Sequence, residues 1–282
     1  MTRMSGPGVV ALTFGVICGA GASIGYAQQI IAGGGFGRFR VEPRWAKASD
    51  FDGAFVYCRG AYQSVRREDG GTDWWTDYPA ADNNFSVRLG ELTRVRVKLD
   101  ATRQPDFIVI PLTDPLLFRC PMLFMEDIGT AEFSEEEVRS LREFFLKGGM
   151  LWVDDFWGTR AWNYWAEESG RVLPPQEFPI RNIPPEDPIM HTLYNVPEVV
   201  QVPSINFWYR SGGSTSERGR DSATVDFKGI RDSHGRLMVV MSHNTDIADT
   251  WEREGENHEY FDLFSPRGYA IGVNIVLYGM TH

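Results

Sequence analysis

Short apolar runs alternate with segments of helical periodicity along most of the chain after residue 50. Each run is compact enough to form one buried strand. The predicted strands are Phe55–Tyr62, Val95–Leu99, Phe107–Leu112, Met122–Met125, Met150–Val153 and Leu237–Met241. Because strands that alternate with helices form parallel sheets covered by helices, the pattern predicts an α/β sandwich with a mainly parallel sheet.

Helices are expected between these strands, and two of them have a clear start signal. Ser134 and Glu137 form the capping-box pattern, in which each side chain satisfies a free backbone N–H group of the other residue. Asp82 is expected to cap a helix that carries Phe85 and Leu89 on one face. The remaining helices are Thr159–Ser169 and one that begins at Ser265-Pro266 and runs to about Met280.

Residues 174–203 depart from this alternation. The segment holds seven of the 16 prolines before Pro203 closes it. Proline removes a backbone donor and fixes φ, so we expect an extended excursion over the surface.

The first 37 residues form a separate region. Residues 4–37 contain no charged side chain and lie between Arg3 and Arg38, with a glycine-rich junction at the end. The apolar stretch fits a secretory signal peptide cleaved after Ala27, and it is also long enough for an uncleaved hydrophobic transmembrane helix. Both interpretations place residues 51–282, the main domain, outside the cytoplasm.

Composition and charge exclude one large class of function. The 282 residues include 38 acidic and 28 basic side chains, for a formal charge of −10, and no run of Lys or Arg occurs. Proteins that bind nucleic acids normally present a basic stripe to the phosphates, so a nucleic-acid partner is not expected.

Only two cysteines lie outside the leader, Cys58 and Cys120. An oxidising compartment would permit a disulfide between them, but their spacing does not establish proximity. Two buried free thiols are the equal alternative.

Several polar and aromatic motifs are too particular for ordinary packing. They are Thr76–Phe85, Leu112–Pro115, Asp154–Gly158, His243–Asp249, Tyr269–Asn274 and Tyr278–His282. With them the chain resembles, over Phe51–His282, the bacterial family called domain of unknown function 4159. The resemblance implies a class I glutamine amidotransferase-like domain of flavodoxin-like architecture, a three-layer sandwich, and attachment to cell-envelope membranes. It implies no settled activity.

The catalytic residues of true amidotransferases are absent from the corresponding motifs. Enzymes of that fold carry a nucleophilic cysteine on a sharp strand-to-helix turn and a His-x-Glu pair elsewhere. Here the strand Met150–Val153 leads into Asp154–Gly158, which has neither Cys nor Ser, and the chain has no His-x-Glu. Amidotransferase chemistry is therefore not expected.

The adjacent carboxylates Asp154 and Asp155 are the catalytic candidates. They follow a central strand, where open α/β sheets bind their ligands, and could hold a cation or act as acid and base. Alternatively, one caps the next helix and the other pairs with an arginine such as Arg160.

His243, Asp246 and Asp249 are the candidate metal ligands, because they offer imidazole and carboxylate groups after another central strand. The alternative is a structural turn, since Asn244 and Asp246 readily bond to their own backbone.

Asp77, Asp82, Asn244 and Trp157 are the candidate ligand-binding residues. Asp77 and Asp82 would otherwise form a turn and a helix cap around Tyr78-Pro79. A sugar could stack on Trp74, Trp75, Trp157, Trp162 and Trp165. However, tryptophans at helical spacing, such as Trp162 and Trp165, usually belong to the core.

We expect a non-enzymatic accessory or scaffold subunit of a larger membrane assembly, with no cofactor and with membrane proteins as partners. The domain would lie on the periplasmic side of a bacterial inner membrane, or in the periplasm if the leader is cleaved. The alternative is an envelope hydrolase for a sugar or peptide, with Asp154, Asp155, His243 and Asp246 around a metal or a polarised water. A ligand-binding module without turnover is a third interpretation.

Overall fold

A seven-stranded sheet forms the centre of the molecule in the computed structural model, which describes residues 41–68, 71 and 73–282. Within these residues the strand order is β3–β1–β4–β6–β9–β8–β7. The bounds are β1 Tyr57–Ala61, β3 Phe107–Pro111, β4 Leu123–Glu126, β6 Leu151–Phe156, β7 Arg181–Asn182, β8 Asp226–Arg231 and β9 Leu237–His243. The first five strands in this order are parallel, whereas β8 is antiparallel to β9 and β7 to β8.

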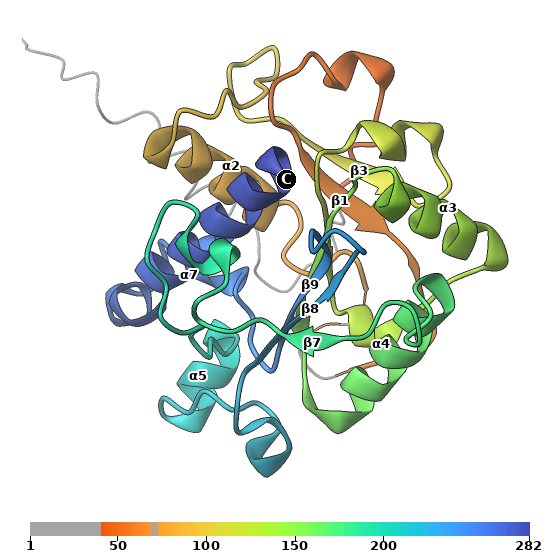
Figure 1. The fold of residues 1–282 in the computed structure, drawn as a ribbon. Helices are drawn as coiled ribbons and strands as arrows, with labels where there is room; N and C mark the ends of the chain where they lie inside the picture. Colours follow the sequence, from red (N-terminus) through yellow and green to blue (C-terminus); the bar gives the residue numbers. More distant parts are fainter. Residues whose placement is uncertain (1–40, 69–70, 72) are drawn as a thin grey trace, which may run out of the picture.

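Helices cover both faces of the sheet (Figure 1). Helices α2 (Ala80–Leu92), α6 (Asp249–Glu252) and α7 (His258–Thr281) pack together on one face. Helices α3 (Glu135–Leu146) and α4 (Gly158–Val172) pack together on the other. The expected α/β class with a mostly parallel sheet is therefore confirmed.

Smaller elements complete the description. They are α5 Ile205–Ser211, the two-stranded antiparallel sheet of β2 Gln63–Ser64 and β5 Ala131–Glu132, and the 3-10 helices η2 Ala48–Asp50, η3 Pro115–Arg119, η4 Ile128–Thr130, η5 Pro188–His191 and η6 Gly219–Ser222.

The central strands are buried on both faces, which explains their nearly continuous apolar sequence. All six residues of β6 are buried. Leu151 and Val153 belong to the apolar cluster under α3 and α4, whereas Trp152 between them belongs to the cluster under α2 and α7. This is the alternation that a pleated strand imposes on its side chains.

Several predicted boundaries agree with the structure, and two strands differ. The strands at β3 and β4 and the capping box of Ser134 and Glu137 are confirmed. The predicted strand Val95–Leu99 makes only isolated bridges, through Val97 and Leu99. Strand β6 continues through both aspartates to Phe156, because these carboxyl groups are buried within the fold instead of ending the strand.

Two predicted helix starts are wrong. Helix α2 begins at Ala80, so Asp82 lies in its first turn and does not cap it. Helix α7 begins at His258, with the Asn257 side chain accepting a hydrogen bond from the Tyr260 N–H, and Pro266 lies inside the helix. Burial of Tyr260 and of the next helical turn extends the helix ahead of the proline.

The proline-rich segment 174–203 packs against the domain. It supplies β7 and η5, and Ile183, Ile189 and Val196 belong to the apolar cluster under α7. Val200 and Val202 pack with residues of α5 and α7 in a third cluster. These five apolar side chains therefore face the chain's own core, whereas Leu193 is exposed.

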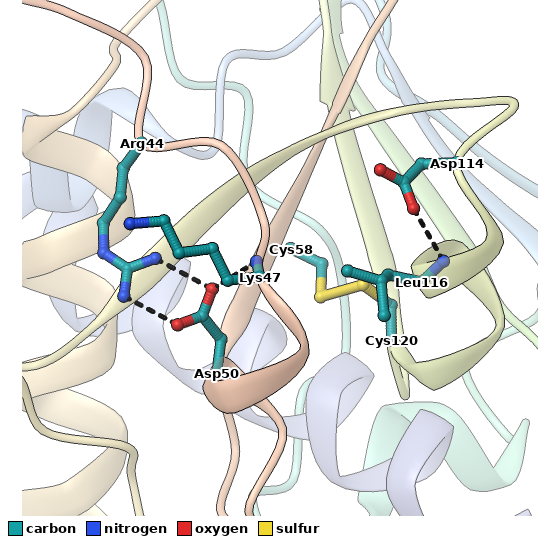
Figure 2. Close-up of a disulfide and its surroundings, with 7 residues drawn as sticks. All are labelled: Arg44, Lys47, Asp50, Cys58, Asp114, Leu116 and Cys120. Carbon is teal, nitrogen blue, oxygen red and sulfur yellow. Dashed lines mark hydrogen bonds and ion pairs between the residues drawn. A yellow bond between two sulfur atoms is a disulfide. The ribbon is translucent and has the colours of Figure 1, made fainter.

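Cys58 and Cys120 form a disulfide, which decides between the two alternatives left open by their spacing (Figure 2). The bridge joins β1 to the residue that follows η3. On the same side of the molecule, Arg44 pairs with Asp50. The Asp114 side chain caps η3 by accepting a hydrogen bond from the Leu116 N–H.

The expected N-terminal hydrophobic helix or signal peptide lies outside the described residues. Among the residues that are described, no helix combines the length and apolar character needed to cross a membrane.

Candidate functional site

Charged side chains gather at the carboxyl ends of the parallel strands. Glu126 ends β4, Asp154 and Asp155 lie near the end of β6, and His243 ends β9. Open parallel sheets bind ligands at this edge, at the point where the strand order reverses direction. Here the reversal falls between β1 and β4, since β1 is followed along the chain by β3 on one side and by β4 on the other.

Arg59 on β1 forms ion pairs with two carboxylates of this region. Its side chain is fully buried, and its Nη2 lies 2.6 Å from Asp82 while its Nη1 pairs with Glu126. Nη1 also donates to the carbonyl oxygens of Trp74, at 3.1 Å, and Thr76, at 2.9 Å. The arginine therefore fixes the loop that leads to residue 77 against β1, β4 and α2.

Three aspartates form an acidic group next to this network. One carboxylate oxygen from each of Asp77, Asp246 and Asp249 lies within 4.8 Å of the others. Asp249 accepts a hydrogen bond from the Ile205 N–H at 2.7 Å, and Asp246 accepts one from the Asp249 N–H at 2.9 Å. Asp77 Oδ2 is buried without a hydrogen-bond partner among the described residues.

The surroundings of these carboxyl groups favour their neutral forms. Burial, followed by the charge of Asp249, raises the pKa of Asp77 to about 8. Burial, with the charges of Asp155 and Asp249, raises the pKa of Asp246 well above its usual range. Close carboxylates in a dry environment cannot all ionise without a cation or protons. These aspartates therefore need either bound protons or a cation nearby.

Asp155 extends the acidic group toward β6. Its φ of 50° is left-handed, and β6 loses its regular register with β9 between Val153 and Phe156. The carboxylate accepts a hydrogen bond from Trp157 Nε1 at 2.7 Å. Burial, with the charges of Asp127 and Asp77, raises the pKa of Asp155 well above its usual range.

Asp154 lies in a different environment from its neighbour. Its fully buried carboxyl group accepts hydrogen bonds from Ser242 Oγ at 2.6 Å and from the Ala248 N–H at 3.0 Å. Burial raises the pKa of Asp154 to about 7. Adjacent aspartates thus serve separate purposes, with Asp154 joining β6 to β9 and the following loop and Asp155 joining the acidic group.

The alternative for Asp154 and Asp155 was that one caps the next helix and the other pairs with an arginine such as Arg160. The N–H groups at the start of α4 instead donate to other residues. The Gly158 N–H at the start of α4 donates to Asn244 Oδ1 at 2.8 Å. The Thr159 N–H donates to Asp221 Oδ2 at 2.9 Å. In the described part of the chain, Asn244 and Asp221 thus occupy the capping role.

His243 lies apart from the two aspartates with which it was grouped. Its Nε2 is 3.1 Å from the Gly158 carbonyl oxygen, and its Nδ1 is 3.4 Å from Asp226 Oδ2. Burial lowers the pKa of His243. The imidazole borders a separate hollow of about 370 Å³ that Trp162 also lines. Asp77 takes the third place in the acidic group instead.

The remaining ligand-binding candidates have structural partners. Asp82 is enclosed by Arg59, and Asn244 has a φ of 62° and holds the start of α4, as a turn-forming asparagine does. Trp157 is buried and donates to Asp155. Trp74 stacks on the neighbouring Trp75 with ring centroids 4.0 Å apart.

Sequence reasoning did not identify Arg59, Glu126 and Asp127. The available signal was the position of these charges, since Arg59 interrupts an apolar strand and the two acids directly follow another. Charged residues are rarely buried unless they are paired, so such placements indicate an internal network.

The fold and this acidic region define an α/β protein with a polar site at the carboxyl edge of a parallel sheet. The chain belongs to the family described as Domain of unknown function (DUF4159), whose model matches residues 62–280. No curated protein matches the chain.

Proposed function

We propose that the protein is a non-enzymatic accessory subunit on the periplasmic side of a bacterial inner membrane, where it stabilises a larger membrane protein complex. The observation that carries this proposal is Asp155, which lies near the end of strand β6, shortly before helix α4, at the place where amidotransferase-like folds present a nucleophile. Its backbone has the left-handed conformation of such a turn, but the residue is only 7% exposed and its carboxylate accepts a hydrogen bond from Trp157. A carboxylate in this setting is a poor nucleophile.

The strand order supports the amidotransferase-like, flavodoxin-like assignment. Numbered along the chain, the five parallel strands β3–β1–β4–β6–β9 have the order 2-1-3-4-5. This is the order of flavodoxin-like doubly wound sheets, in which ligands bind at the carboxyl edge.

Two features support an extracytoplasmic location. Disulfides persist mainly in oxidising compartments, and Cys58 and Cys120 form one. The uncharged stretch 4–37 fits export, either as a cleaved signal peptide or as a retained anchor. A retained anchor would hold the accessory domain at the membrane. After cleavage of a signal peptide, the partner would hold it there.

Exposed apolar side chains on α5 and α7 offer a surface for that partner. Tyr209 on α5 is 52% exposed, and Leu263 on α7 is 42% exposed. These two helices pack together through Trp208 and Tyr260, whose ring centroids are 5.7 Å apart. We propose that these two side chains belong to one apolar patch, because contiguous exposed apolar patches mark protein–protein contacts.

Isolation of the native protein in mild detergent tests the proposal. We expect it to elute with at least one membrane protein, and a double variant, Tyr209→Ser with Leu263→Ser, to release that partner while keeping its melting temperature. A lone monomer from native membranes would contradict the proposal. Intact mass in the same sample decides the fate of the leader, because a retained leader gives about 31.9 kDa and cleavage after Ala27 removes 27 residues.

An envelope hydrolase is the second candidate, favoured by the raised pKa values of Asp77 and Asp155. A carboxyl group with a pKa near neutrality is suited to act as a general acid or base. His243 lies apart from this group, so the aspartates would carry the chemistry. Asp155→Asn would abolish hydrolysis of peptidoglycan fragments without changing the melting temperature, since asparagine tolerates the left-handed backbone. Absence of any hydrolysis by the native protein would exclude this candidate.

A further inference from the structure

We propose that Asp77, Asp246 and Asp249 bind a divalent cation, and that the cation is Ca²⁺. Three separate segments supply the ligands, namely the loop before α2, the loop after β9 and the first residue of α6. This inference does not depend on the proposed accessory role.

The spacing of the oxygens fits one ion of this size. Ca²⁺ binds oxygen at about 2.3–2.6 Å, so two ligands on opposite sides of one ion are about 5 Å apart at most. One oxygen from each of the three carboxylates lies within 4.8 Å of the others. A single Ca²⁺ can therefore contact all three.

A buried carboxylate oxygen without a hydrogen-bond partner is a second observation that favours a ligand at this group. Asp77 Oδ2 is shielded from solvent and accepts no hydrogen bond from a described residue. Glu126, which pairs with Arg59 through its Oε2, is also fully buried, and among the described residues its Oε1 has no hydrogen-bond partner. Buried acceptors without a partner are rare in folded proteins, and a bound ion is one of the explanations for them.

The nearby arginines are already paired with other carboxylates. Arg59 is enclosed by Asp82 and Glu126. Arg253 pairs with Glu252 and Glu256 and reaches Asp249 only at 3.8 Å. These arginines therefore compensate little of the negative charge that the three aspartates would carry when ionised.

The ligand chemistry selects the kind of cation. All three ligands are carboxylates, which suit hard cations such as Ca²⁺. The imidazole of His243 faces Gly158 and Asp226, and both cysteines of the domain are in the disulfide. Among the described residues, the nitrogen and sulfur ligands that Zn²⁺ prefers are therefore missing from this group.

Calcium titration of the full-length protein, purified in mild detergent and treated with chelator, tests the site. We expect saturable heat of binding by calorimetry. We also expect the melting temperature to rise by about 5–10 °C when Ca²⁺ exceeds its dissociation constant about 100-fold. Zn²⁺ should bind more weakly than Ca²⁺.

Three variants locate the binding. Asp77→Asn and Asp246→Asn should each weaken Ca²⁺ binding by about tenfold or more, because affinity follows the number of charged ligands. Asparagine tolerates the φ of 60° at residue 77, and it can keep the bond from the Asp249 N–H at residue 246. Asp262→Asn, an exposed change on α7, should bind Ca²⁺ like the parent protein.

The outcomes are decisive in both directions. Binding that is lost in the two site variants and kept in Asp262→Asn supports the proposal. Absence of heat and of a melting shift with Ca²⁺ would overturn it, as would unchanged affinity in both site variants. Preferential binding of Zn²⁺ would overturn the choice of cation.

Discussion

Two groups of carboxylates adjoin each other at the carboxyl edge of the sheet, and they differ in one respect. In the first group, Asp82 and Glu126 surround the guanidinium of Arg59. In the second group, one carboxylate oxygen from each of Asp77, Asp246 and Asp249 lies within 4.8 Å of the others, and Arg253 approaches Asp249 at 3.8 Å without enclosing the group. Burial alone therefore does not mark a functional residue. A charge that the chain itself balances is part of the scaffold, and a charge that it leaves unbalanced is available to a ligand.

Removing the arginine should have the largest effect. Arg59→Leu leaves two carboxylates buried without their partner, and we expect the free energy of unfolding to fall by about 3–5 kcal/mol. Urea denaturation measures the change. Arg139→Leu, at an exposed site on α3, is the matched control and should change stability by less than about 0.5 kcal/mol. If both variants lost a similar amount of unfolding free energy, the ion pairs of Arg59 would be no more important for stability than an exposed residue.

Removing one charge from each group should sharpen the comparison. Asp82→Asn loses charge-assisted hydrogen bonds to Arg59, and we expect it to cost about 1–3 kcal/mol. Asp77→Asn removes a carboxyl group that repels its neighbours when ionised and whose Oδ2 accepts no hydrogen bond from a described residue, so the calcium-free protein should keep or gain stability. Chemical denaturation of both variants in chelator gives the comparison. A larger loss of unfolding free energy in Asp77→Asn than in Asp82→Asn would contradict the distinction between the two groups.

Asp154 gives a smaller effect, which depends on pH. Burial raises its pKa from 3.8 in the unfolded chain to about 7 in the folded one. Between these values the folded state holds more protons, so this carboxyl group's contribution to stability is present at low pH and is lost as pH rises to about 7. The slope is at most about 1.4 kcal/mol per pH unit.

Asp154→Asn tests this contribution. The amide can donate to Ser242 Oγ while its oxygen accepts from the Ala248 N–H, which imitates the protonated acid. Denaturation between pH 4 and 7 should show a loss of stability with rising pH that is steeper in the parent protein than in the variant. Parallel curves would mean that Asp154 stays ionised in the folded protein.

The alternation of the sequence was sufficient to predict the class of fold. It failed where burial of polar groups or distant packing decides a boundary. Asp154 and Asp155 look like the end of a strand, yet the hydrogen bonds of Asp154 to Ser242 and Ala248 hold them inside it. Likewise, Ser265-Pro266 is a valid local start signal, but burial of Tyr260 extends α7 further toward its N-terminus.

The site was predictable by residue type but not by grouping. Asp77, Asp155, Asp246 and Asp249 stand out in the sequence as polar residues beside strands and turns. Which of them meet depends on how the loop before α2 folds over the sheet, and the fully buried Arg59 fixes that loop. His243 precedes the two aspartates closely in the sequence, but spacing along the chain does not report the direction of a side chain.

The disulfide has a consequence for how the protein should be produced. Cys58 and Cys120 are separated by 62 positions, and the enclosed loop carries Arg59, Asp77 and Asp82. Closing a loop of this size contributes about 4 kcal/mol on chain-entropy grounds. Protein made in a reducing cytoplasm would lack the stabilisation that the disulfide provides. The affected loop is the one that brings Asp77 close to Asp246 and Asp249. Expression with export to an oxidising compartment is therefore part of any meaningful binding measurement.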